Sequence, residues 1–288
     1  MASPYLIAWG SGALVFAVGG ALLLDRRSRR AGTLPSPMLW CGPGLGLVLA
    51  IVGAKLHPFL LNLDELREIG SAATAAEVMK IVAASGQRIG GGLILATLFF
   101  GLVLPKRLRG HLNGWAVLDA IAPLSGLAMA IGRLGCLAAG CCFGSLCESF
   151  FCLDYPPGSP PWWNHFARGL LTDHGAPSLA VHPLPLYLAA LGLLASAGAW
   201  CLPRPRWPTG SAFLIFAIIF SGGRLLVERS RESILLVEIP LQTAIDQAVL
   251  CAALASFLWR WQTHRSGTAS AIQPSSKDGS SRPGIPSA

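Results

Sequence analysis

Seven long apolar runs constrain the fold of this chain more than any other feature. Most of them reach the roughly 20 residues that a helix needs to cross a bilayer. They lie near 5–24, 40–63, 89–104, 116–134, 182–202, 211–228 and 239–261. Only helices and closed barrels satisfy their backbone groups in lipid, and these runs are too long for barrel strands. The sequence therefore predicts an all-α integral membrane protein with about seven transmembrane helices.

The charged residues predict how this bundle is oriented. Basic clusters follow the first, third, fifth and seventh runs, all on one side of the alternation. Lys and Arg collect in cytoplasmic loops, so the N-terminus is expected outside and the C-terminus in the cytoplasm. This placement accounts for the net charge of +8 without a nucleic-acid partner. One membrane domain is expected over 1–263, followed by a disordered cytoplasmic tail over 264–288 that is rich in Ser, Gly and Pro.

An outer loop near 135–181 concentrates cysteine. Its five cysteines are Cys136, Cys141, Cys142, Cys147 and Cys152. The outer side of a bacterial membrane is oxidising, so a pair of stapling disulfides is predicted, with the fifth thiol either free or paired outside the chain. The spacings contain no Cys-x-x-Cys, which argues against a zinc site and a thioredoxin-like motif.

Two further outer stretches are open to alternative interpretations. The segment 64–88 is expected to form either an amphipathic helix on the membrane surface or a solvated connector. Trp162 and Trp163 in the outer loop are expected to anchor it at the membrane interface rather than to contact a substrate.

Two arginines lie within the apolar runs, Arg133 and Arg224. Placing a guanidinium in hydrocarbon costs about 3 kcal/mol on insertion scales, so these residues are expected to hold an anion, and the planar fork suits phosphate. Glu228 follows Arg224 by one helical turn and is expected to orient it; an intramembrane salt bridge alone is the alternative. Asp119 or Asp246 are candidate partners for Arg133.

Polar or small residues also open two of the apolar runs. His182 is a candidate base, and Tyr187 is a candidate donor to a lipid oxygen; a Pro-initiated helix with interfacial side chains is the alternative. Gly91 and Gly92 are expected either to open bare backbone to a headgroup or to permit close helix packing.

The order of these patches resembles the bacterial prolipoprotein diacylglyceryl transferase family. Four motifs carry the resemblance: Gly91-Gly92-Leu93-Ile94, Gly132-Arg133-Leu134-Gly135-Cys136 running to Gly140 and Gly144, His182-Pro183 with Leu186-Tyr187, and Gly223-Arg224 with Glu228 and Arg231. The resemblance implies transfer of the diacylglyceryl group of phosphatidylglycerol to the lipobox cysteine that follows the signal peptide of a secreted prolipoprotein. It implies an enzyme of the bacterial cytoplasmic (inner) membrane that needs no metal and no redox cofactor.

The resemblance also implies roles for individual residues. Arg133 and Arg224 are expected to bind phosphate and Glu228 to orient Arg224, while His182 is a candidate base. The expected substrate contacts are Gly91, Gly92, Gly132, Gly135, Gly140, Tyr187 and Arg231.

The chain departs from the family pattern at several polar positions. Cys136 and Ala139 replace two asparagines, Cys141 replaces a glutamate, and Gly90 replaces a histidine. Two other functions therefore stay open: a membrane thiol–disulfide protein that uses the outer cysteines, and a non-catalytic lipid-binding protein of the same fold.

Overall fold

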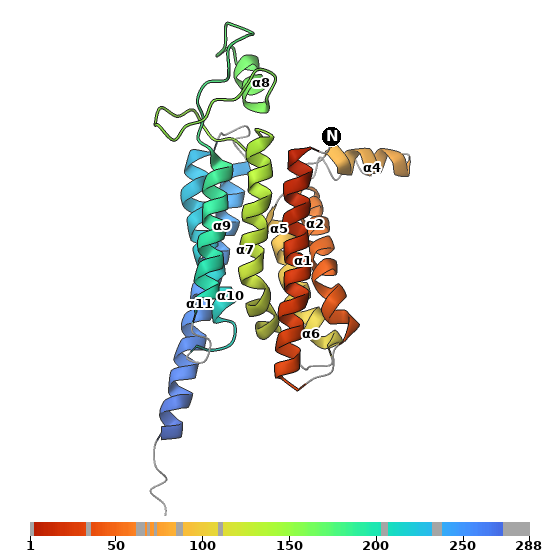
Figure 1. Cartoon of the computed structure of the whole chain (residues 1–288), viewed down its shortest axis with the longest axis vertical. Helices are drawn as coiled ribbons and strands as arrows, with labels where there is room; N and C mark the ends of the chain where they lie inside the picture. Colours follow the sequence, from red (N-terminus) through yellow and green to blue (C-terminus); the bar gives the residue numbers. More distant parts are fainter. Residues whose placement is uncertain are drawn as a thin grey trace, which may run out of the picture.

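The chain forms a bundle of long helices (Figure 1). A computed structural model describes residues 3–32, 36–61, 67, 70–71, 74–84, 89–108, 112–202, 207–231 and 238–272. The helices are α1 (Pro4–Arg30), α2 (Pro37–Leu61), α4 (Ala75–Ala84), α5 (Ile89–Leu98), α6 (Leu104–Arg107), α7 (Gly114–Ala138), α8 (Pro160–Ala167), α9 (Leu184–Trp200), α10 (Ser211–Val227) and α11 (Glu238–Ile272). A π-helical turn, η1 (Phe99–Val103), joins α5 to α6, and a 3-10 turn, η3 (Glu228–Ser230), ends α10.

Five helical stretches are long and apolar enough to cross a membrane. They are Pro4–Arg30, Pro37–His57, Gly90–Arg107, Gly114–Ala138 and Ser211–Ser230. The prediction of an integral membrane protein built from helices is thereby confirmed. The other two predicted runs correspond to α9, an apolar helix of 17 residues, and α11, a helix of 35 residues. Their status as crossings and the orientation of the termini stay predictions.

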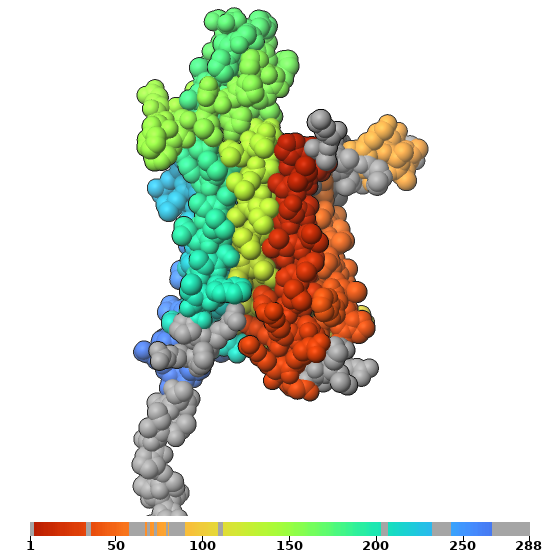
Figure 2. Space-filling model, in the orientation of Figure 1, coloured from red at the N-terminus to blue at the C-terminus, as the bar shows by residue number. Residues whose placement is uncertain are grey.

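Helix α7 lies at the centre of the bundle and packs against α1, α9 and α10 (Figure 1). It contributes to two apolar cores. The first joins α7 to α1, α2 and η1, with Phe16, Leu24, Leu39, Phe100 and Leu118 among its buried side chains. The second joins α7 to α9 and α10, with Ala122, Leu188, Leu191, Phe216 and Phe220 buried. The buried side chains of α7 in these cores all come from its first half, and they hold it between α1 and α9, which flank it in Figure 2.

Helices α2 and α5 meet almost backbone to backbone at Gly91 and Gly92. A β carbon on Gly91 would overlap the Gly53 carbonyl oxygen, and one on Gly92 would overlap the Ala50 carbonyl oxygen. The Gly91 amide also donates to Nδ1 of His57 at 3.1 Å. This geometry favours the packing interpretation of the two glycines, and a role in contacting substrate stays a prediction.

Asp119 does not partner Arg133. Its carboxylate accepts hydrogen bonds from the Gly210 amide at 2.6 Å and the Phe213 amide at 2.9 Å. A carboxylate at this position caps the N-terminus of α10 and meets the positive end of its dipole. Fourteen residues of α7 separate Asp119 from Arg133, about 21 Å along the axis at 1.5 Å per residue.

Helix α4 accounts for part of the segment 64–88. Thr74 and Glu77 form a reciprocal cap at its start, with both bonds at 3.2 Å. Figure 1 shows α4 projecting sideways at the end of the bundle where the chain begins. The rest of this segment lies largely outside the described residues. At the other terminus α11 continues to Ile272, so the predicted boundary at 263 falls inside a helix, and 273–288 lie outside the described residues.

Candidate functional site

The candidate site lies where α7 ends and three chain segments pair with one another. The Gly144 amide donates to the His182 carbonyl at 2.9 Å, the His182 amide to the Ser145 carbonyl at 3.0 Å, and the Ser145 amide to the Ser230 carbonyl at 2.9 Å. Gly144 and Arg231 form an antiparallel bridge. These bonds fasten the cysteine-rich segment to the start of α9 and the end of α10, so three of the four motifs meet at one end of the bundle.

Gly144→Ala is expected to disrupt this junction. A β carbon there would overlap the Ser230 carbonyl oxygen and would lie 2.7 Å from the His182 β carbon, and backbone atoms cannot yield as a flexible side chain does. Overpacking of this kind costs about 1–3 kcal/mol, which thermal unfolding of the purified protein in detergent would register as a lower midpoint. Gly44→Ala is the matched control, because a β carbon at Gly44 meets nothing within 4 Å. Equal midpoints for the two variants would contradict this account of the junction.

Arg133 is buried near the end of α7 and has no anionic partner among the residues that the structure describes. Arg133 is 9% exposed, and its Nε has no hydrogen-bond partner within the described part of the chain. The indole Nε1 of Trp9 is a second buried donor without a partner among those residues. The Trp9 ring packs against α7 next to Arg133, since a β carbon on Gly132 would lie 2.8 Å from it. Two unmatched donors at one helix end favour an acceptor-rich ligand such as phosphate.

Arg224 is buried as well, but two carboxylates hold it. Its Nε lies 3.0 Å from Oδ2 of Asp246, and one of its terminal nitrogens lies 3.3 Å from Oε2 of Glu228. Glu228 also pairs with Nε of Arg231 at 2.8 Å. Asp246 therefore partners Arg224 and not Arg133. Within this network two arginines face two carboxylates, and α10 is tied to α11.

The remaining predicted site residues are placed as follows. His182 and Tyr187 share a hydrogen bond at 3.2 Å between Nδ1 and the phenol oxygen. Gly135 packs against α1, where a β carbon would lie 2.7 Å from that of Ala8. Gly140 has a φ of 64° and turns the chain after α7. The glycines thus shape the site, and contacts between them and a substrate stay predictions.

The two tryptophans of the loop have different surroundings. Trp162 is buried in the loop and donates from Nε1 to the Ala176 carbonyl at 2.9 Å. It therefore helps to hold the loop's own fold and is not exposed as an anchor would be. Trp163 is 57% exposed, and interface anchoring stays the prediction for it.

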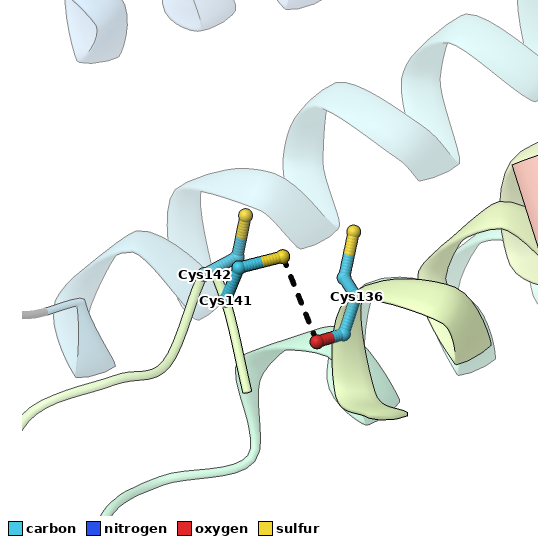
Figure 3. A group of neighbouring side chains, drawn as sticks. All are labelled: Cys136, Cys141 and Cys142. Atoms are coloured by element: carbon cyan, nitrogen blue, oxygen red, sulfur yellow. Dashed lines mark hydrogen bonds between the residues drawn. The ribbon is translucent and has the colours of Figure 1, made fainter. Parts of the chain in front are cut away.

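The outer cysteines divide into one disulfide and one thiol cluster. Cys147 and Cys152 are disulfide-bonded, whereas Cys136, Cys141 and Cys142 are free. The prediction of two disulfides is therefore wrong for the described residues, which contain one. The three free sulfurs lie within 4.8 Å of one another, and Figure 3 shows Cys141 and Cys142 on the turn that faces Cys136 at the end of α7. We call these three residues the thiol cluster.

The thiol cluster has a marked electrostatic asymmetry. Hydrogen bonds from Cys136 and Cys141, followed by the positive charges of Arg133 and Arg231, lower the pKa of Cys142. Hydrogen bonding to Cys136 and Cys142, together with burial, raises the pKa of Cys141. Because both arginines act on the same sulfur, Arg133 and Arg231 lie within electrostatic reach of the thiol cluster.

Most of the chain is similar in sequence to one family of known proteins. The sequence profile of the prolipoprotein diacylglyceryl transferase family matches residues 7–261, a range that includes every residue of the candidate site. The phosphatidylglycerol–prolipoprotein diacylglyceryl transferase of Clostridium tetani is 25% identical over 76% of this chain and 79% of its own length. The protein of the same name from Pseudomonas entomophila is 26% identical over 78% of this chain and 76% of its own length. A third, from Clostridium perfringens, is 30% identical over 48% of this chain and half of its own length.

Proposed function

Because the chain belongs to the prolipoprotein diacylglyceryl transferase family, we propose that it transfers the diacylglyceryl group of phosphatidylglycerol to a prolipoprotein cysteine, with Arg133 as the phosphate ligand. The enzyme works in the bacterial cytoplasmic membrane, in keeping with its apolar helices and its relatives. The acceptor thiol loses its proton, and the sulfur attacks the glycerol carbon that carries the phosphate. A carbon–sulfur bond forms, the carbon–oxygen bond to phosphate breaks, and glycerol phosphate leaves with the electron pair.

The observation that carries this proposal is the buried guanidinium of Arg133, whose Nε has no hydrogen-bond partner and which forms no ion pair among the described residues. A buried cation without a counterion is costly, and the penalty amounts to several kcal/mol even after relaxation. A bound phosphate offsets that cost with charge-assisted hydrogen bonds. As the carbon–oxygen bond breaks, negative charge grows on the phosphate, so a guanidinium already in place stabilises the transition state more than the ground state. Arg231 lies at the same end of the bundle, but its charge is already matched by Glu228.

Arg224 and Glu228 act as positioning residues in this proposal. The charge of Arg224 is already matched by Asp246 and Glu228, so it has less attraction left for a phosphate than Arg133 has. Glu228 holds Arg224 with one carboxylate oxygen and Arg231 with the other. The network therefore fixes Arg231 relative to α10. His182, oriented by Tyr187, stays the candidate base for the acceptor thiol.

The positions of the basic residues support the membrane orientation that we propose for the enzyme. Arginines occupy the last turn of α1, and Lys106 with Arg107 ends α6; Figure 1 shows both helix ends opposite the end that carries α8. Since basic residues collect on the cytoplasmic side, the thiol cluster and Arg133 face outward. We infer that α9 and α11 also cross the bilayer, which gives seven crossings and the N-terminus outside. That orientation puts the site on the side where secreted prolipoproteins emerge.

Rescue of a depleted host tests the function directly. The full chain is expressed in a bacterium whose own transferase is repressed, and thioether-linked lipid on a reporter prolipoprotein is measured by mass spectrometry. In parallel, the purified chain is reconstituted with phosphatidylglycerol, and release of glycerol phosphate is followed. Rescue together with glycerol phosphate release is the expected result. A chain that inserts stably, rescues nothing and consumes no lipid would contradict the proposal and favour a lipid-binding or thiol–disulfide protein.

A further inference from the structure

The thiol cluster has the composition and geometry of a zinc site with one open position. Cys136 is buried, Cys141 is partly buried and Cys142 is exposed, so the cluster is anchored in the protein and reachable from outside. At a zinc–sulfur distance of about 2.3 Å, tetrahedral ligands lie about 3.8 Å apart. The three sulfurs already lie within 4.8 Å of one another. Small side-chain rotations are therefore enough to complete the site.

The backbone is shaped to bring the three sulfurs together. The Cys141 amide donates to the Cys136 carbonyl at 3.1 Å, which closes the turn after α7. Cys142 has a φ of 59°, in the left-handed region that side-chain-bearing residues rarely adopt. Figure 3 shows that this conformation places the Cys142 sulfur on the same side of the turn as the other two. Strained backbone of this kind recurs at ligand-binding positions, where the surrounding structure maintains it.

The charges around the cluster fit an anionic metal complex. Zinc with three thiolates carries a net charge of about −1, since each thiolate contributes one negative charge. Arg133 has no counterion within the described residues and lies in electrostatic reach of the cluster. Its guanidinium has five N–H donors, which lets it face the sulfur cluster and a lipid phosphate together. The nearby network of Arg224, Arg231, Glu228 and Asp246 contributes no net charge.

We propose that Cys136, Cys141 and Cys142 bind one zinc ion, and that the acceptor cysteine of the prolipoprotein completes the coordination as a thiolate. Zinc sites with three protein ligands leave a fourth position for water or substrate, and a thiol that coordinates zinc is deprotonated. The acceptor proton passes to the candidate base His182, and the sulfur attacks the glycerol carbon, whose bond to the phosphate oxygen breaks as glycerol phosphate leaves with the electron pair. The thioether product, a neutral and weaker ligand, then leaves the metal. This role for the fourth position rests on the proposed transfer reaction, whereas zinc binding does not.

Metal content and spectroscopy test the zinc site separately from activity. The full chain, purified in detergent under reducing conditions, is equilibrated with buffered Zn²⁺ and desalted, and zinc per chain is measured by mass spectrometry. About one zinc per chain is expected, and Co²⁺ in its place is expected to give a thiolate-to-cobalt charge-transfer band. Cys136→Ser and Cys141→Ser should each weaken zinc binding at least tenfold. The double variant Cys201→Ser, Cys251→Ser is the matched control, because both cysteines are exposed and outside the cluster, and it should bind like the parent.

Each remaining outcome decides one part of the proposal. Absence of zinc from the folded parent chain, zinc binding unaffected by Cys136→Ser, or a disulfide within the cluster of the purified protein would overturn the metal site and favour thiol–disulfide chemistry. If zinc binds but glycerol phosphate is never released, the site stands and the proposed transfer fails. If chelated, zinc-free protein that remains folded transfers lipid at the full rate, the acceptor does not bind at the fourth position.

Discussion

Arg133→Ala is expected to lower the rate of diacylglyceryl transfer about 1000-fold. The guanidinium of Arg133 is the buried cation that lacks a counterion in the described part of the chain, and it is assigned to the phosphate that gains charge in the transition state. Loss of one preorganised donor at such a position costs about 100- to 1000-fold in rate in other enzymes, and here a full charge is lost with it. Arg133→Lys keeps the positive charge but cannot donate two parallel hydrogen bonds to one phosphate. An intermediate loss of transfer rate is therefore expected. Release of glycerol phosphate from reconstituted phosphatidylglycerol vesicles gives both rates.

Thermal stability separates this role from a structural one. Removal of Arg133 leaves no carboxylate without its partner among the described residues, so the unfolding midpoint of Arg133→Ala in detergent should stay level or rise. Arg107→Ala, at the opposite end of the bundle in α6, controls for general loss of a basic side chain and should transfer lipid normally. A midpoint that falls in step with activity would show that Arg133 serves the fold rather than the phosphate.

The sequence predicted the spans because hydrophobicity is a local property. Each apolar run can be recognised from its own residues alone. The helices Pro4–Arg30 and Gly114–Ala138 contain the predicted runs 5–24 and 116–134, with a few residues added at each end. The alternation of the runs predicted that the motifs share one end of the bundle, and the structure brings three of the four together there. The limits of α11 were missed because the polar stretch after 263 carries no apolar signal, and yet it continues the helix to Ile272.

The contacts inside the site could not be predicted from the sequence, because they join residues that only the fold brings together. Asp246 reaches Arg224 across 22 residues and two helices, and no spacing rule connects them. The thiol cluster was missed for a related reason. The spacing of Cys136, Cys141 and Cys142 matches no common metal motif, and their sulfurs converge only because Gly140 and Cys142 both take left-handed conformations after α7. His57 and Trp9 were likewise not singled out, although Nδ1 of His57 accepts from the Gly91 amide and the Trp9 ring lies against Gly132.

Asp246→Leu is expected to destabilise the bundle by about 3 kcal/mol. The carboxylate of Asp246 and the guanidinium of Arg224 have only 10% and 5% of their side-chain surface exposed, and they meet at 3.0 Å. Breaking a buried pair from one side costs about 3–5 kcal/mol because the remaining charge stays buried, and Glu228 still compensates part of it here. The free energy of unfolding, measured by denaturant titration in mixed micelles, should therefore fall by the lower end of that range.

The double variant Asp246→Leu, Arg224→Met distinguishes a buried-charge penalty from lost packing. Replacing both members of a buried pair with apolar residues is often neutral or stabilising, so the double variant should regain most of the stability that Asp246→Leu loses. The transfer rate of this stable double variant then tests whether Arg224 contacts the phosphate or only positions other residues. Glu228 retains its bond to Arg231, and Arg133 is untouched, so a rate within about tenfold of the parent would fit a positioning role for Arg224. A stable double variant with a loss as large as that of Arg133→Ala would instead place Arg224 on the phosphate, beside Arg133.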